Sequence, residues 1–490
     1  MSGSPQTNRM YATQIGAKNV KRSLLRRLPA VIGSLALIAV TGCNVGPNYK
    51  RPTYPTPPAF HGADNAAVAT DSSASIGDQQ WSQVFHDPDL KQLIARALSN
   101  NYDIRIAAER VAEQRAQVQI TRSQQFPQLT GGGSGVGASI PSTSGVNIDS
   151  PLSFGSFDLS ASWTPDFWGL YRRQTEAARA TLLAQVWAQR AVRLSLVQQV
   201  VTDYLQLRAY DQQLVVAKQT LKVRQDSVQL TETLERGGSS PLSDVRQAEQ
   251  LLYTATSQIP QLEQGVQQEE NAINLLLGQN PGVPVPRAGD PIAPPPENLP
   301  VGLPSQLLER RPDIEQAEQT LVAANAQIGV ARAQFFPQLT LTASAGLGGN
   351  EWSNLFDPAG KTIYGIGQLA QPIFEGGKLT GQLRQAQATE RAMLLTYQQT
   401  IAGAFRDVSN ALVAYNKQRA YREEQEKLVA AAKDATRLAR LRYQGGATGY
   451  LEVLTTDSSL FAAQLNLVSA QQGEALTLVQ LYTTLGGGWQ

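Results

Sequence analysis

The pentapeptide FPQLT occurs twice, at residues 126–130 in QQFPQLTGGG (124–133) and at residues 336–340 in QFFPQLTLTA (334–343). The two copies are 210 residues apart, and other identical pairs share an offset of 210 or 208. These pairs are Asp103-Ile104 with Asp313-Ile314, Ala116-Gln117 with Ala326-Gln327, Gly237-Gly238 with Gly445-Gly446, and Leu277-Gly278 with Leu485-Gly486. Such a period is far too long for a solenoid repeat. The sequence therefore predicts an internal twofold repeat, with the second half a diverged copy of the first.

Each FPQLT is predicted to mark a switch from helix to strand, because a Phe-Pro pair cannot continue a helix. Apolar and small polar residues alternate over residues 339–347 and again over 157–163. This alternation is typical of a strand with one apolar and one polar face. Each half is expected to carry a β-hairpin, at about 128–165 and about 338–372, with Gly/Ser-rich loops at 131–153 and 348–361.

A long helical hairpin is expected after each β-hairpin, at about 171–277 and about 378–485. Residues 171–236 contain no Gly and no Pro, and their apolar residues follow the 3–4 spacing of a coiled-coil seam. At a rise of 1.5 Å per residue this stretch would be about 100 Å long. Gly237-Gly238 and Gly445-Gly446 are expected to form the two hairpin turns.

The N-terminus has the features of an exported, lipidated protein. Residues 1–42 carry six basic residues and no acid, and an apolar run at 30–40 leads into Thr41-Gly42-Cys43. This pattern predicts a signal peptide over 1–42, although an uncleaved membrane anchor is the alternative and translation could begin at Met1 or Met10. Cys43 is the only cysteine, and its context resembles a bacterial lipobox, which predicts acylation of Cys43 rather than an incidental thiol.

Composition argues against nucleic-acid binding and against catalysis. The chain has 42 Lys and Arg against 40 Asp and Glu, and without the signal peptide 36 bases face 40 acids. The basic excess therefore belongs to the signal peptide and gives no support for a nucleic-acid partner. The two histidines, His61 and His86, leave no metal cluster and no catalytic triad. We expect no enzyme, no metal and no cofactor, and we expect Asp87 to cap a helix.

Four strands of about ten residues have the length of tilted membrane-spanning strands, but a four-stranded sheet would leave unpaired backbone groups in lipid. About eight strands is the usual minimum for a barrel, so three copies, giving twelve strands, would close the sheet. The fold class predicted is an α+β membrane protein, a trimeric 12-stranded transmembrane β-barrel with four strands per chain, continuous with a long α-helical coiled-coil periplasmic barrel. A soluble β-hairpin domain is the alternative.

The domain organisation follows from these elements. The expected divisions are a signal peptide (1–42), a lipidated N-terminal tether (43–80), a first structural repeat (81–278), a Pro-rich crossover (279–312) and a second structural repeat (313–490). The crossover is not expected to separate independent domains, because neither half looks able to close its own core.

Several motifs together resemble the outer-membrane efflux lipoproteins, the TolC-like, NodT-like outer-membrane factors of resistance–nodulation–division (RND) pumps. The motifs are TGC ending at Cys43, GPNYKRP, WSQVFHDPDLKQLIARALSNNYDI, LPSQLLERRPDIEQAE, both FPQLT copies, GYLEVL and LYTTLGGGW. The resemblance spans the chain from Cys43 onward. It implies a homotrimer in the bacterial outer membrane, anchored by lipid and extending into the periplasm. The implied partners are outer-membrane lipid, a periplasmic membrane-fusion adaptor and an RND-type inner-membrane transporter.

The same resemblance implies a gate near the periplasmic tips, over residues 449–461. Leu451 matches a constriction leucine of the family, whereas Thr455 and Ser458 stand where charged residues often occur. Glu452 and Asp457 could supply an acidic ring instead, with Asp457 out of register, or they could be solvated helix positions. The turns are expected to contact the adaptor or to be simple turns. Their residues are Gly237, Gly238, Ser239, Ser240, Gly445, Gly446, Ala447 and Thr448.

The function expected is an exit duct that passively conducts drugs or other small molecules out of the cell. Two alternatives stay open: an outer-membrane channel for type I-like protein secretion, and a periplasmic lipoprotein that acts as a coiled-coil scaffold. Substrate choice is not readable from these motifs.

Overall fold

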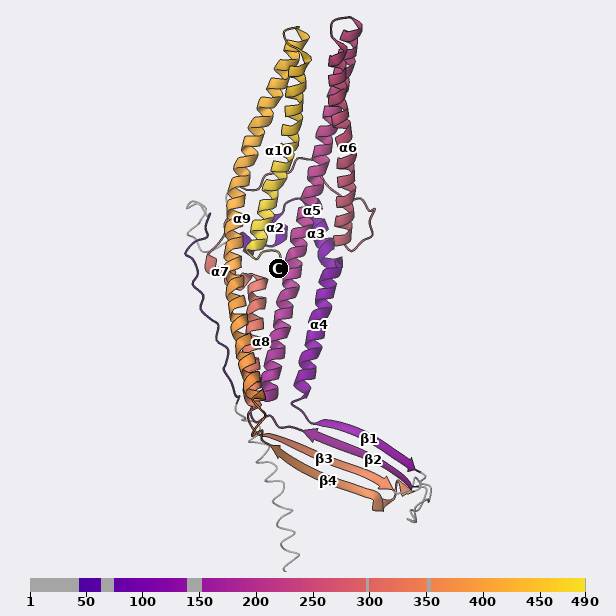
Figure 1. Cartoon of the computed structure of the whole chain (residues 1–490), viewed down its shortest axis with the longest axis vertical. Helices are drawn as coiled ribbons and strands as arrows, with labels where there is room; N and C mark the ends of the chain where they lie inside the picture. Colours follow the sequence, from indigo (N-terminus) through magenta and orange to yellow (C-terminus); the bar gives the residue numbers. More distant parts are fainter. Residues whose placement is uncertain (1–43, 63–74, 139–151, 297–298, 350–353, 490) are drawn as a thin grey trace, which may run out of the picture. The chain divides into compact units, whose positions relative to one another are not determined.

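The computed structural model describes residues 44–62, 75–138, 152–296, 299–349 and 354–489, so Cys43 and the predicted signal peptide lie outside the described residues. The helices are η1 (Ile76–Asp78), α2 (Trp81–Val84), α3 (Pro88–Asn100), α4 (Tyr102–Ser123), α5 (Leu170–Arg236), α6 (Leu242–Leu276), α7 (Pro304–Arg310), α8 (Pro312–Ala333), η3 (Pro358–Gly360), α9 (Lys378–Gln444) and α10 (Tyr450–Thr484). The strands are β1 (Gln128–Ala138), β2 (Leu152–Trp163), β3 (Gln338–Gly349) and β4 (Lys361–Ala370) (Figure 1).

The internal repeat is visible in the lengths of the helices. Helices α5 and α9 each have 67 residues, α6 and α10 each have 35, and α4 and α8 each have 22. The chain divides into a strand unit, from residues 1–51, 115–181 and 321–393, and a helical unit, from 52–114, 182–320 and 394–490. Each unit draws on both halves of the chain, so the two sequence repeats are interleaved in each unit rather than folded apart.

The four strands form one antiparallel sheet in the order β1-β2-β3-β4. Gly132 pairs with Asp158, and Asp158 pairs in turn with Gly346. The loop expected at 131–153 was wrong for its first part, because β1 continues to Ala138. Its run of glycines lacks the side-chain alternation that identifies a strand, and pairing with β2 supplies the order instead. The second loop also begins later than expected, since β3 continues to Gly349.

Residues in register across the sheet share a face, which divides the strands into an apolar and a polar side. The apolar face carries Leu129, Phe157, Leu159, Ala161, Trp163, Leu339, Leu341, Ala343, Ala345, Leu347, Ile363 and Leu369. The polar face carries Thr130, Ser134, Ser156, Asp158, Ser160, Ser162, Thr340, Thr342, Ser344, Thr362 and Gln368, with Val136, Phe154, Tyr364 and Ile366 as apolar or aromatic exceptions. This is the division expected of a sheet between lipid and a water-filled lumen.

The outer edges of β1 and β4 have no partner strand among the described residues, and every residue of β4 is exposed. The internal repeat predicts how these edges would meet in a neighbouring copy. Ser160 of β2 pairs with Ser344 of β3, and the equivalent positions in the other half are Gln368 and Ser134. The same rule places Ile366 opposite Val136, which would pair two of the apolar exceptions on the polar face.

The first described residues of the chain are held by a buried arginine in the strand unit. Arg173, which is 1% exposed, donates hydrogen bonds to the carbonyls of Val45 and Gly46 and to Oδ1 of Asn48. Gly46 has φ +106°, and a Cβ there would lie 2.5 Å from Cα of Gly329. The GPNY segment, at the start of the predicted tether, is therefore seated in a slot shaped for its backbone.

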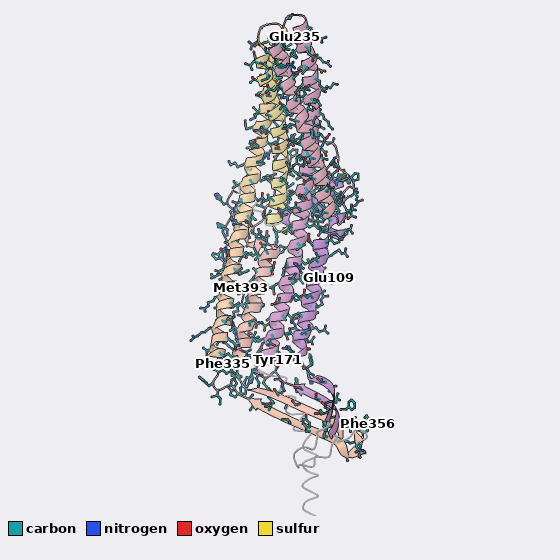
Figure 2. All side chains as sticks on the ribbon, turned by 45° about the vertical axis from the view of Figure 1, so that its right-hand side comes forward. Glu109, Tyr171, Glu235, Phe335, Phe356 and Met393 are labelled. Atoms are coloured by element: carbon teal, nitrogen blue, oxygen red, sulfur yellow. The ribbon has the colours of Figure 1, made fainter. Side chains whose placement is uncertain are left out.

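The helical unit has small, separate apolar clusters. One cluster joins all four long helices through Val228 of α5, Ala248 of α6, Ala439 of α9 and Tyr450 and Val453 of α10. Figure 2 shows α5 beside α6 and α9 beside α10 as two helical hairpins, with Glu235 labelled at the end of α5. Many buried seam residues are alanines, so each contact removes little apolar area from water. No helix in the described ranges is both long and apolar enough to cross a membrane.

One acidic position on α6 is unfavourable at neutral pH. Burial and, to a lesser extent, the negative charge of Asp203 on α5 together raise the pKa of Glu269 to about 7. Burial also raises the pKa of Asp203 itself. A carboxyl whose pKa is higher in the folded than in the unfolded chain costs stability as the pH rises from about 4.5 to about 7. Helices α5 and α6 are therefore held together less tightly above neutral pH than in mild acid.

We expect Glu269→Gln to raise the melting temperature above pH 7 and to change it little near pH 4.5, because the substitution removes the cost of ionising a buried carboxyl. Melting followed by circular dichroism at both pH values measures this. Glu270→Gln is the matched control, since Glu270 accepts a 2.6 Å hydrogen bond from Arg287 and its loss should lower the melting temperature. A pH-independent effect of Glu269→Gln would contradict the account.

Candidate functional site

The two hairpin turns have the same backbone geometry. At the first turn Gly238 N–H donates to the Glu235 carbonyl and Ser239 N–H donates to the Leu234 carbonyl, both at 2.8 Å. At the second, Gly446 donates to Tyr443 at 3.0 Å and Ala447 donates to Arg442 at 2.8 Å. Gly238 and Gly446 have φ of +72° and +69°, the left-handed cap that favours glycine. A Cβ on either would meet nothing, so both turns are open to an external partner.

Four of the five expected gate residues lie at the start of α10 with their side chains partly or fully exposed. Leu451 is 64% exposed, and Thr455 and Ser458 are also exposed. Glu452 is half-buried: its carboxylate accepts hydrogen bonds from Arg442 at 2.7 Å and from Thr448 at 2.5 Å. These residues are placed near the second turn and can face a neighbouring copy or a lumen.

Asp457 differs from the other four, because its side chain points into the helical unit and is 6% exposed. Arg224 of α5 donates from Nε to Asp457 Oδ2 at 2.9 Å, and Arg440 of α9 donates from Nη2 to Oδ1 at 2.6 Å. Arg224, only 2% exposed, also donates from Nη1 to the Leu251 carbonyl of α6 at 2.7 Å. We call these four residues the Asp457 cluster. Its carboxylate is paired within the chain, as the Glu452 carboxylate is with Arg442 and Thr448, so neither side chain offers a free carboxylate for an acidic ring in this structure.

The Asp457 cluster connects all four long helices through charge-assisted hydrogen bonds. The Arg224 guanidinium also lies 4.9 Å from the centre of the Phe461 ring, which adds a cation–π contact. At the 208-residue offset its charged members correspond to Glu249, Ala432 and Glu232, so the other half lacks the cluster. The repeat symmetry is therefore broken at this cluster.

Sequence reasoning named Asp457 but missed its partners. A signal for Arg224 was present, because it lies seven residues after Ala217 and four before Val228, on the buried seam of α5. A charged residue on such a seam needs a partner. The partner itself was not readable, since Asp457 is 233 residues away. Asp87 does cap α3, accepting hydrogen bonds from the amides of Asp89 and Leu90.

The sequence matches the family described as "Outer membrane efflux protein" over residues 93–279 and 303–487. The two matched segments fall on the two halves of the internal repeat and cover most of the chain.

The chain belongs to the outer membrane efflux protein family.

Relatives and solved structures agree with this membership. The chain is 36% identical over 456 residues to the cation efflux system protein CusC of Escherichia coli O6:H1, covering 92% of this chain and 97% of the relative. It is 35% identical over 465 residues to the solvent efflux pump outer membrane protein SrpC of Pseudomonas putida, covering 93% and 97%. The open-state MtrE outer membrane channel of Neisseria gonorrhoeae superposes with a TM-score of 0.81 at 31% identity, over 91% of this chain and 99% of MtrE.

The predicted fold class is confirmed. Solved relatives are trimeric outer-membrane channels with four strands per chain, and this efflux protein is likewise an outer-membrane exit channel that extends into the periplasm. The family is one of ducts rather than of enzymes. Within the part of the chain that the structure describes, no group of three or more His, Cys, Asp and Glu side chains is placed to hold a metal ion.

We expect Asp457→Asn to lower the free energy of unfolding by about 3–5 kcal/mol, because it leaves Arg224 buried without a counterion. Replacing both partners, as Asp457→Leu with Arg224→Met, should cost far less, since a buried pair and an apolar pair of similar volume are nearly equivalent. Guanidinium unfolding followed by the helical signal measures both. Asp434→Asn, which removes an exposed pair with Arg437, should change the free energy by less than about 1 kcal/mol.

Proposed function

We propose that this efflux protein is the passive exit duct of a tripartite pump and that the Asp457 cluster holds its periplasmic end closed. A periplasmic adaptor docks on the two turns, and an RND-type transporter delivers the substrate. The observation that supports this gate is that the buried Asp457 carboxylate of α10 joins Arg224 of α5 and Arg440 of α9. Arg224 in turn donates a hydrogen bond to the Leu251 carbonyl of α6. Widening the periplasmic end requires the two helical hairpins to separate, and this contact opposes that separation.

The cluster suits a closure that can be reversed. Its ion pairs are strong while the helices exclude water, and they lose most of their strength when water enters. The surrounding apolar seam is thin, with Ala248 and Ala439 at the contact, so little hydrophobic area must be exposed for the hairpins to part. Adaptor contacts at the turns, Gly237 to Ser240 and Gly445 to Thr448, would then supply the free energy of opening. Leu451 and Glu452 would line the narrowest part.

The N-terminus anchors the duct in the inner leaflet of the outer membrane. Residues 1–42 are the signal peptide and Cys43 is the acylated first residue of the mature chain. Support comes from the slot that receives the next residues, since Val45 N–H donates to the Trp168 carbonyl and Asn44 packs against Gly169. Trp168 follows the end of β2, so residue 44 begins at the strand end that would face the periplasm.

The duct itself does not choose the substrate. Relatives named for cation efflux and for solvent efflux are 36% and 35% identical to this chain, a difference too small to separate two chemistries. The polar face of the sheet carries mostly hydroxyl groups, which suit a water-filled path for many small molecules. Selection would fall to the transporter. Protein secretion is an alternative function for such a duct, and export assays distinguish it from the export of small molecules. A periplasmic scaffold, the other alternative, would need no amphipathic sheet.

Conductance in planar bilayers tests both the duct and its closure by the Asp457 cluster. The parent trimer should conduct weakly, and Asp457→Asn should raise conductance several-fold and sensitise cells to vancomycin, which crosses intact outer membranes poorly. The paired variant Asp457→Leu with Arg224→Met should stay closed, because it keeps the helices packed. An unchanged conductance in Asp457→Asn would contradict the role of the Asp457 cluster in closure. If the single and the paired variants opened equally, the charge at residue 457, and not the packing of the helices, would control closure.

A further inference from the structure

One charged side chain on the polar face of the sheet has no role in the gate or in docking. Asp158 lies in the middle of β2, and the described strands carry just one other charged residue, Lys361, whose register with Leu347 places it on the apolar face. Asp158 is exposed, and none of the described residues makes a hydrogen bond or ion pair with it. Its carboxylate is therefore free to act on mobile ions.

The neighbouring strands leave space around this carboxylate. Gly132 on β1 and Gly346 on β3 are the residues in register on either side. A Cβ on Gly132 would lie 3.0 Å from Asp158 Oδ1, and one on Gly346 would lie 3.1 Å from Asp158 Cβ. Larger residues would crowd the aspartate, whereas the two glycines keep it open to water. A Cβ on Gly346 would also lie 2.7 Å from the Phe157 carbonyl oxygen, so the backbone requires glycine there as well, whereas at Gly132 the Asp158 carboxylate is the nearest group.

We infer that Asp158 sets the charge selectivity of the outer-membrane section of the duct, favouring cations; this rests on the proposed channel function. Threefold symmetry places three Asp158 carboxylates at one height in the lumen, a ring of the kind that selects cations. Twelve tilted strands enclose a backbone radius of roughly 12 Å. The Asp158 carboxylates then lie within about 8 Å of the channel axis, which is about one Debye length at physiological salt. The ring's field covers most of the lumen.

Reversal potentials across a tenfold KCl gradient test this assignment, at low salt where the Debye length is about 30 Å. The Glu452→Gln channel serves as the parent, so that the half-buried Glu452 carboxylate near the gate does not dominate. Asp158→Asn should shift the reversal potential toward zero, and Asp158→Lys should carry it past zero toward anion selectivity. Moving the carboxylate two residues along the same face, with Asp158→Ser and Ser160→Asp together, should restore cation selectivity. Ser160→Asn should leave the reversal potential unchanged.

A conducting Asp158→Asn channel with the parent's reversal potential would overturn the inference, and a parent that does not conduct at all would overturn the duct on which it rests. Labelling gives an independent check of the face. Asp158→Cys should react with a charged, membrane-impermeant thiol reagent in the intact trimer, while Leu159→Cys, on the opposite face, should not. Reaction at 159 but not at 158 would also overturn the inference.

Discussion

Backbone hydrogen bonding at the two free edges of one small sheet is the constraint on which the rest of this structure depends. Among the strands that the structure describes, β1 and β4 each have a neighbour on one side only, and lipid offers no water to satisfy the remaining N–H and C=O groups. One chain cannot close its own sheet with four strands, whereas three chains can. The trimer in turn brings three pairs of helical hairpins together, and the channel follows from that assembly. The duplication makes a closed barrel easier to form, because each half of the chain supplies one β-hairpin of the same design.

The helical unit, unlike the sheet, is held together by weak side-chain contacts rather than by a continuous set of backbone hydrogen bonds between neighbours. Its helices make many small contacts through alanine seams and a few buried polar ones, so cohesion is spread thinly over long elements. Near one end, a buried carboxylate shared by two arginines joins α5, α9 and α10, and Arg224 extends the contact to α6. A hydrogen-bonded sheet and a thinly packed helical unit fit a duct that must stay anchored while it opens.

How far the sequence predicted this structure depended on the range of the interactions involved. Alternation over residues 157–163 and 339–347 identified β2 and β3, and paired glycines located both turns, because those signals are local. β1 was only partly recognised, since Gly131 to Gly133 remove the side-chain alternation on which the prediction relies. Arg224, Arg440 and Arg173 were missed as partners because their contacts join segments far apart in the chain. The gate positions beside Asp457 stay predictions drawn from family resemblance.

Disulfide cross-linking at the seam between copies tests the central claim most directly. The internal repeat places Gln368 of β4 opposite Ser134 of β1 in the next copy, so a chain with cysteines at both positions should be trapped by oxidation as a covalent ring of three. Shifting one cysteine to Gly133, on the other face of β1, should abolish the ring. Oxidation that gives only monomers in native membranes, for this pair and for pairs two residues to either side, would contradict the account.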